Sequence, residues 1–177
     1  MSAVPAPVVI RRFLASDASD YRALRLRALA EHPDAFTSSV EEEANKPLSW
    51  SEQRLAAGAD KPHDFFLGAF SAHKLLGMVG IVGRYRPKER HNATVVGMYV
   101  APELAGQGAG LRLMREAMQQ ATALPDLEQL DLTVTAGNDR AQGIYARCGF
   151  TVYGILPRAI QVQGRYYDKV HMVLRLR

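Results

Sequence analysis

Three glycines alternate in the stretch VAPELAGQGAGLRLM, residues 100–114. They are Gly106, Gly108 and Gly110, and a segment with the apolar spacing of a helix follows them directly. Because glycine has no Cβ atom, the backbone N–H groups of such a loop can approach a ligand closely. The start of a helix adds further free N–H groups and the positive end of its dipole. The spacing therefore predicts an anion site, most simply a phosphate site.

Two familiar phosphate loops do not fit this spacing. The dinucleotide pattern G-x-G-x-x-G/A needs Gly or Ala at its sixth position, which is Leu111 counted from Gly106 and Leu113 counted from Gly108. The P-loop ends in Gly-Lys followed by Ser or Thr, and the sequence has no such tripeptide. A bend alone needs one glycine, so three in five residues favour phosphate. The predicted donors are the backbone N–H groups of Gln107, Ala109 and Leu111.

A second stretch with chemical content is NDRAQGIYARCGF, residues 138–150. Asn138 suits the N-cap of a helix, and Gly149 suits its end. Tyr145 lies on the apolar face of this predicted helix, where it can serve as a core aromatic or as a functional phenol. Cys148 has no partner motif and is predicted to be a buried, inert thiol.

Together the two stretches resemble the GCN5-related N-acetyltransferases (GNAT family). The cofactor segment of that family follows a strand, has the pattern [R/Q]-x-x-G-x-[G/A], and often follows V-x-P-E. Ala105 stands at the first position of this pattern, which removes a polar side chain but leaves the backbone donors in place. The matching positions are Val100, Pro102, Glu103, Gly106, Gly108 and Gly110.

The second stretch is similar to the family motif N-x-x-A-x-x-x-Y-x-x-x-G-F. One predicted helix and one predicted strand separate the two motifs, as the family requires. The resemblance rests on motifs from about Val95 to Phe150, and on the order of elements elsewhere. The matching positions are Asn138, Ala141, Tyr145, Gly149 and Phe150.

The resemblance implies direct acetyl transfer from acetyl-CoA to a primary amine of a small molecule, an amino acid or a peptide N-terminus, without a metal. Tyr145 would be the catalytic proton donor to the leaving thiolate, since a phenol is protonated at pH 7. A strand N–H at Met98 or Tyr99 would polarise the thioester oxygen. The implied cofactor-binding residues are Met98, Tyr99, Val100, Gly106, Gln107, Gly108, Ala109, Gly110, Leu111, Asn138 and Tyr145.

The general base is not indicated by the sequence, because the strand NATVVGMYV before the loop carries no carboxylate. Glu103, the run Glu41, Glu42 and Glu43, Asp168 and a chain of waters all stay open. The missing carboxylate also keeps a second hypothesis open, a non-catalytic acyl-CoA-binding or sensor module.

The apolar patterns predict the strands and helices that position these residues. Strands are predicted over 8–14, 64–70, 75–85, 93–102 and 127–137, with two more in 150–176 around Gln163–Gly164. Helices are predicted from Asp17 or Ser19 to Pro33, over 49–58 ending at Gly58, after the glycine loop, and over 138–148; 34–47 is a polar connection. Gly97 is expected at a β-bulge or a close packing contact.

This order predicts an α/β (α+β) fold with a mixed, mostly antiparallel sheet of six or seven strands and about four helices. The two strands joined across the glycine loop should be parallel with a right-handed crossover. Length predicts a single domain over 8–177, with a frayed N-terminus over 1–7.

Composition narrows the function classes. A single cysteine excludes an internal disulfide, and the five histidines lack metal-ligand spacing, so no metal is expected. No apolar run has the length of a membrane helix and no signal peptide is evident, so we expect a cytoplasmic protein without a membrane or nucleic-acid partner. The basic cluster over 83–91 is interpreted as a solvated loop. A monomer or a homodimer is expected.

Overall fold

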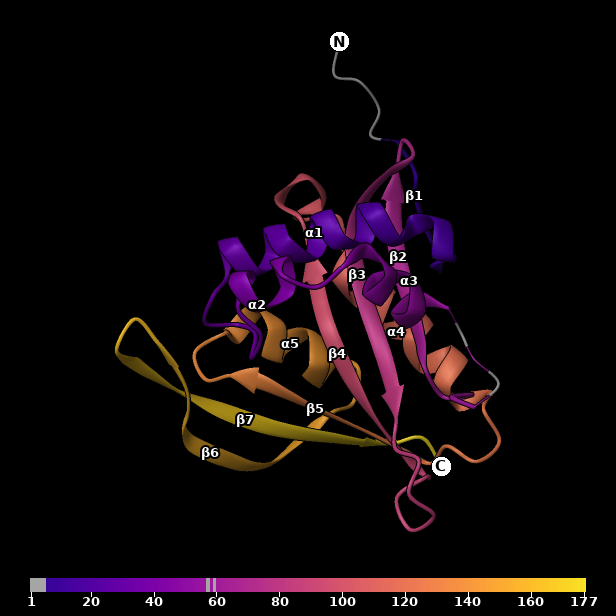
Figure 1. Ribbon diagram of the computed structural model, residues 1–177. Coiled ribbons are helices and arrows are strands. Elements are labelled where there is room, and N and C mark those ends of the chain that lie inside the picture. Colours follow the sequence, from indigo (N-terminus) through magenta and orange to yellow (C-terminus); the bar gives the residue numbers. More distant parts are fainter. Residues whose placement is uncertain (1–5, 57, 59) are drawn as a thin grey trace.

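The computed structural model describes residues 6–56, 58 and 60–177, and most of the predicted frayed N-terminus lies outside these residues. Seven strands form one sheet in the order β1-β2-β3-β4-β5-β7-β6 (Figure 1). The neighbouring strands are antiparallel except β4 and β5, which are parallel as predicted. The strands are β1 (Val8–Arg12), β2 (Phe65–Ser71), β3 (Lys74–Gly83), β4 (Asn92–Val100), β5 (Gln129–Thr135), β6 (Thr151–Val162) and β7 (Arg165–Arg175).

Helices cover both faces of this sheet. Figure 1 shows α1 and α4 on opposite faces of the sheet, and both helices contact β3. This explains why β2 and β3 are buried along almost their whole length. Short 3-10 turns at Ala15–Asp17 and Pro102–Leu104 precede α1 and α4. The helices are α1 (Ala18–Glu31), α2 (Val40–Ala44), α3 (Leu48–Leu55), α4 (Ala109–Thr122) and α5 (Asp139–Arg147).

The structure differs from the predicted elements most clearly at α2, at the end of α3 and at the end of β1. The polar connection contains α2, because the side chain of Ser39 accepts a hydrogen bond from the N–H of Glu42 at 3.1 Å and the Glu42 carboxylate accepts one from the N–H of Ser39. Five helices are therefore described where about four were expected. The third helix ends at Leu55 rather than at Gly58, since Ala56 is already extended. The first strand ends at Arg12, two residues early.

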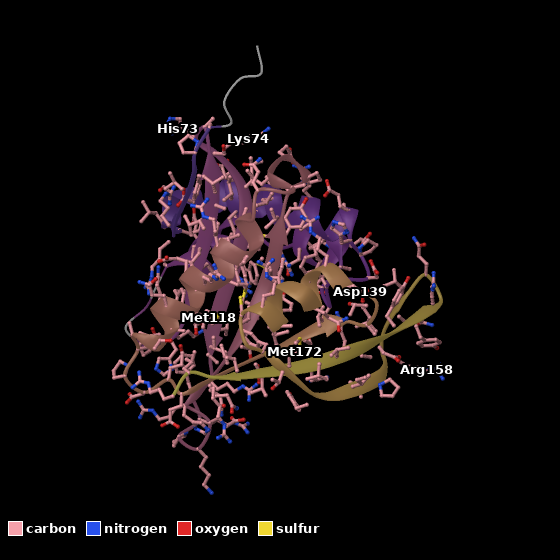
Figure 2. All side chains as sticks on the ribbon, turned by 180° about the vertical axis from the view of Figure 1, so that it is seen from behind. His73, Lys74, Met118, Asp139, Arg158 and Met172 are labelled. Atoms are coloured by element: carbon pink, nitrogen blue, oxygen red, sulfur yellow. The ribbon has the colours of Figure 1, made fainter. Side chains whose placement is uncertain are left out.

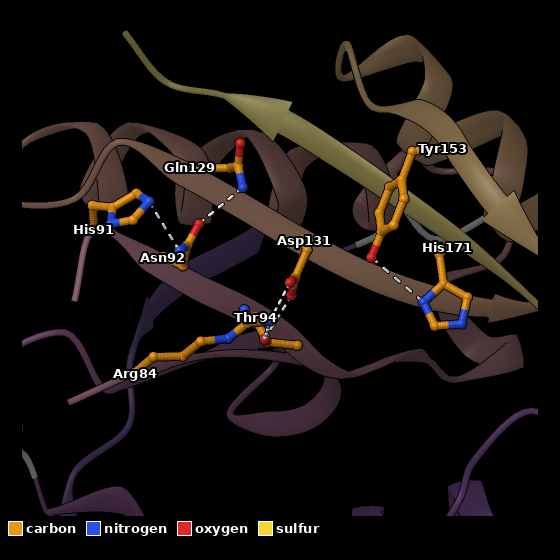
Figure 3. Close-up of polar contacts among 8 residues, drawn as sticks. All are labelled: Arg84, His91, Asn92, Thr94, Gln129, Asp131, Tyr153 and His171. Atoms are coloured by element: carbon orange, nitrogen blue, oxygen red, sulfur yellow. Dashed lines mark hydrogen bonds and ion pairs between the residues drawn. The ribbon is translucent and has the colours of Figure 1, made fainter. Parts of the chain in front are cut away.

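The strands β4 and β5 pair only at their starts. Their parallel ladder joins Asn92–Thr94 to Gln129–Asp131, and beyond it the two strands diverge (Figure 1). Side chains tie the two strands together at this end, because Thr94 donates to Asp131 at 2.6 Å and Arg84 pairs with the same carboxylate (Figure 3). The divergence leaves one edge of β4 without a neighbouring strand, and it opens beside the glycine loop.

Gly97 lies at a bulge in β4, as one of its two predicted interpretations required. The register with β3 shifts between Met78 and Gly80, so two residues of β4 lie opposite one residue of β3. Gly97 has a φ of +63°, a conformation that glycine adopts without steric cost. The bulge bends β4 at the position where it leaves β5.

Candidate active site

A cleft of about 830 Å³ brings together four segments that are distant in sequence. They are the end of β4, the glycine loop with the start of α4, α5 with the connection that precedes it, and the connection between α1 and α2. A smaller cavity of about 110 Å³ lies between β4 and β5 and is lined by Gly97, Met98, Asn138 and Tyr145. Figure 2 shows Asp139 at the N-terminal end of α5, where the two cavities share Asn138.

The three glycines of the loop have two different roles. Gly106 and Gly108 have φ values of +76° and +69°, and a Cβ atom added to either would meet no atom within 4 Å. The space in front of them is therefore open. At Gly110 a Cβ atom would lie 3.0 Å from Ile144 Cδ1 and 3.3 Å from Met98 Cε, so this glycine allows α4 to pack against α5 and β4.

The start of α4 supplies the free donors. Arg112 is the first residue whose N–H makes a helical bond, to the carbonyl of Gly108 at 3.1 Å. The N–H groups of Ala109, Gly110 and Leu111 precede it and donate to no backbone carbonyl of the described residues, and all three residues line the cleft. These groups and the helix dipole favour an anion at this end of the cleft.

Gln107 differs from the other predicted loop donors. Its N–H donates to the carbonyl of Leu104 at 3.3 Å, and its side chain donates to the carbonyl of Glu103 at 3.2 Å. The residue does not line the cleft. The structure therefore places Ala109 and Leu111 at the anion end of the cleft and turns Gln107 away from it.

The backbone of β4 presents two residues to its unpaired edge. Ala101 donates its N–H to Leu76 of β3 at 2.8 Å, and Tyr99 lies opposite Met78 in the same register. Successive residues of a strand point their N–H groups to alternate sides, so the N–H of Tyr99 also faces β3. Met98 and Val100 then face the side on which β5 diverges. Of the two N–H groups predicted to polarise the thioester oxygen, only that of Met98 therefore faces the gap between β4 and β5.

Tyr145 is a core aromatic that also lines a cavity of the site. Its side chain is only 6% exposed and packs edge-on against Phe150, as a core aromatic does. It also lines the small cavity between β4 and β5. Burial, and secondarily the neighbouring Cys148 thiol, raises the pKa of the Tyr145 phenol, so it carries its proton at neutral pH.

Asn138 is the N-cap of α5, as predicted. Its Oδ1 accepts a hydrogen bond from the N–H of Ala141 at 3.2 Å. The residue also lines both cavities, and the cap leaves its side-chain NH₂ group available as a donor.

The predicted carboxylates lie away from the cleft, and all of them except Glu41 have partners elsewhere. Arg27 binds Glu103 through two hydrogen bonds of 2.8 and 3.0 Å and lowers the pKa of that carboxyl to about 2. Glu43 is buried beside Lys46 at 3.3 Å, Glu42 caps α2, and the Asp168 side chain accepts from the N–H of Arg158 at 2.8 Å. Neither Glu103, Asp168 nor any of Glu41–Glu43 lines the cleft.

Five titratable residues that line the cleft were not identified from the sequence: His32, Asp34, Asp139, Arg140 and Arg147. His32 and Asp34 line it from the connection between α1 and α2. From this connection, only the later glutamates Glu41, Glu42 and Glu43 were candidates for the general base. The buried Lys169 of β7 holds the segment in place, since its Nζ donates to the carbonyl of Ala35 at 3.1 Å and to the hydroxyl of Thr135 at 2.8 Å. The Thr135 hydroxyl in turn donates to the carbonyl of Asp34 at 2.6 Å.

Tyr99 connects β4 to the glycine loop through side chains. Its hydroxyl donates to Glu31 at 2.5 Å, and Arg27 joins Glu31, at 2.7 Å, to Glu103. Burial, followed by this hydrogen bond, raises the pKa of the Tyr99 phenol. Cys148 is buried, and burial raises the pKa of its thiol, as expected of an inert cysteine.

Two features are absent from the described residues. These residues contain no group of three or more His, Cys, Asp or Glu side chains placed to hold a metal ion. None of the helices in the described part of the chain has the length and apolar character needed to cross a membrane.

Comparison with known proteins agrees with this geometry. The acetyltransferase (GNAT) family profile matches residues 26–150. The chain is 28% identical to an L-methionine sulfoximine/L-methionine sulfone acetyltransferase of Pseudomonas paraeruginosa, over 84% of this chain and 87% of that protein. It is 26% identical to the L-amino acid N-acetyltransferase AaaT of Escherichia coli, over 93% and 96% of the two chains.

A solved structure of similar fold is that of yncA from Salmonella typhimurium, a protein described as an acetyltransferase and determined with its cofactor acetyl-CoA. The TM-score is 0.79 at 20% sequence identity, and the match covers 97% of this chain and 95% of that one. The family match spans both sequence motifs, and the fold around them is the one on which the family builds its site. The chain therefore belongs to the GNAT family of acetyltransferases.

Proposed function

We propose that this protein is an acetyl-CoA-dependent N-acetyltransferase that transfers the acetyl group to a primary amine of a small molecule, an amino acid or a peptide N-terminus. One observation carries the proposal: an open cradle of free N–H groups lies where β4 and β5 separate. Relatives named for acetylating methionine sulfoximine and L-amino acids support an amine acceptor. The donor and a free Cys148 thiol suit a reducing compartment, and we propose the cytoplasm.

The cradle fits the diphosphate of coenzyme A. The N–H groups of Ala109, Gly110 and Leu111 would donate to it, and the open space before Gly106 and Gly108 would hold its oxygens. A Cβ atom at either of these two glycines would project into that space. Bound there, acetyl-CoA supplies the activated acetyl group, and the cradle fixes its position along the cleft.

The unpaired edge of β4 would hold the rest of the donor. Met98 and Val100 present backbone groups to which the two amides of the pantetheine arm can hydrogen-bond, as a neighbouring strand would. The N–H of Met98 would stabilise the negative charge that develops on the thioester oxygen. The side-chain NH₂ of Asn138 would contact the arm from the other side of the gap.

Two proton transfers would accompany the reaction. Tyr145 would donate its phenolic proton to the departing thiolate, since burial keeps that proton in place at neutral pH. Asp34 or His32 would accept the proton that the amine nitrogen loses as it attacks, because they are the titratable groups that the α1–α2 connection brings to the cleft. The amine attacks the carbonyl carbon directly, so no acyl-enzyme is formed.

The absence of a carboxylate from β4 supports a second candidate, an acyl-CoA-binding module without catalysis. Thiol release from acetyl-CoA, measured with a panel of amino acids, polyamines and peptide N-termini, distinguishes the two. We expect acceptor-dependent thiol release and an acceptor one acetyl group heavier by mass spectrometry. Binding of acetyl-CoA in calorimetry without thiol release on any acceptor would support the module instead.

A further inference from the structure

One face of α5 carries two arginines into the cleft. Arg140, Gly143, Ile144 and Arg147 follow one another at spacings of three, one and three residues, and all four line the cleft. Residues three, four and seven apart share a helix face. A Cβ atom at Gly143 would meet no atom within 4 Å, so the face recedes between the two guanidinium groups. This leaves room for a group wider than an extended chain.

The order of these residues along α5 places Arg147 at the outer end of the cleft. Ile144 contacts the position above Gly110, which fixes where α5 crosses the start of α4. Arg140 lies on the side of that crossing near Asn138 and the β4–β5 gap, and Arg147 lies one turn beyond it. Arg115 lies one turn along α4 from Leu111, which lines the cleft, and so shares its face of the helix. Burial raises the pKa of the Cys148 thiol, and the charges of Arg115 and Arg147 both act to lower it.

These positive charges are not neutralised by the protein. Arg115, Arg140 and Arg147 are exposed, and no carboxylate of the described residues lies within 4.0 Å of their guanidinium nitrogens. Arg112, on the same helix as Arg115, differs because its guanidinium group donates a hydrogen bond to the carbonyl of Val8 at 3.0 Å. The outer end of the cleft therefore has positive charge that an anionic ligand can use.

We propose that Arg147, assisted by Arg115, binds the 3′-phosphate of coenzyme A and makes the site select donors that carry this phosphate. The inference rests on the proposed function, since it takes acetyl-CoA as the donor. With the diphosphate at the start of α4 and the pantetheine arm running inward along β4, the adenosine must extend outward between α4 and α5. A phosphate on its ribose then meets Arg147, whose planar guanidinium suits bidentate binding of phosphate oxygens.

Calorimetry with two donors tests the assignment without requiring turnover. The dissociation constants of acetyl-CoA and of acetyl-3′-dephospho-CoA are measured for the native protein, Arg147→Gln and Arg140→Gln. Arg175→Gln is the matched control, because Arg175 is exposed at the end of β7, away from the cleft, and its loss changes the net charge equally.

We expect the native protein and the control to bind acetyl-CoA about tenfold more tightly than the dephospho donor, the low end for an exposed charge-assisted pair. In Arg147→Gln this ratio should fall to within about twofold of one, with the affinity for the dephospho donor unchanged. Arg140→Gln should weaken both donors and keep the ratio. Unchanged binding of the dephospho donor also shows that the Arg147 variant is folded.

The outcomes separate this inference from the proposed function. Equal affinity of the native protein for both donors, or a tenfold ratio that survives in Arg147→Gln, overturns the role of Arg147 while leaving acetyl transfer in place. Failure of the native protein to bind either donor overturns the proposed function itself. Raising the salt concentration should reduce the native ratio, since an exposed ion pair is screened.

Discussion

Replacing Gly108 by valine tests the cradle most directly. Gly108 has a φ of +69°, and a side chain there would project into the open space assigned to the diphosphate. A branched side chain would displace a phosphate oxygen from the neighbouring N–H groups. Hydrogen bonds to a charged group contribute about 1.5–3 kcal/mol each, so losing one or two of them should weaken acetyl-CoA binding by roughly 10- to 1,000-fold or more.

The same substitution also strains the backbone, and a control must separate the two effects. A β-branched residue at positive φ costs roughly 1–2 kcal/mol of folding free energy. Gly164 offers a matched position, since its φ is +78°, a Cβ atom there also meets nothing within 4 Å, and it lies in the β6–β7 turn away from the cleft. Gly164→Val should therefore lose a similar amount of stability and keep its affinity for acetyl-CoA.

Urea unfolding gives the free energy of unfolding of both variants, and calorimetry gives their dissociation constants for acetyl-CoA. We expect similar losses of stability and a loss of affinity confined to Gly108→Val. Unchanged affinity in the folded Gly108→Val protein would refute the cradle. An equal loss of affinity in both variants would mean that strain, rather than a blocked phosphate site, weakens binding.

Three further variants test the other groups of the site. Tyr145→Phe should lower kcat by about 10²-fold with little change in the Kd of acetyl-CoA, because only the proton donor is removed; an unchanged kcat assigns that proton to another group. Asp34→Asn should lower kcat/KM at least about tenfold while the Kd of acetyl-CoA holds, and equal losses in both would point to a structural role. Arg27→Gln should weaken acetyl-CoA binding a few-fold, because Glu103, which closely precedes the glycine loop in sequence, loses its two hydrogen bonds to Arg27. The native Glu103 pKa of about 2 lies below the usual value of 4.5, so this pair stabilises the fold above pH 4.5 and loses its effect as the pH falls toward 2. Acid titrations of stability that superimpose for the native protein and Arg27→Gln would contradict that reasoning.

Several features of the site were predictable because they depend on residues close together in the chain. Positive φ at Gly106 and Gly108 follows from a tight turn before a helix, and the Asn138 cap follows from its place at the start of α5. The sheet pattern was predictable because β2 and β3 are apolar along almost their whole length. The short helix α2 was missed although its signal is local, a serine followed three residues later by a glutamate.

The sequence could not predict in this way which carboxylates and which backbone N–H groups face the cleft. Glu103 adjoins the loop in sequence, but Arg27 of α1 engages it across the fold, whereas Lys169 near the C-terminus holds the segment that brings Asp34 to the cleft. Likewise, the direction of the Tyr99 N–H depends on its register with β3.

The sequence alone determined how the glycine loop and the start of α4 are built, because backbone conformation at glycines and helix starts is decided within a few residues. It also determined the family, because the residues of both motifs are set at fixed spacings along one chain. Only the tertiary structure decided which side chains meet in the cleft. Gly110 shows the difference: its place in the motif is visible in the sequence, but its role follows from Ile144 and Met98, which long-range packing brings against it.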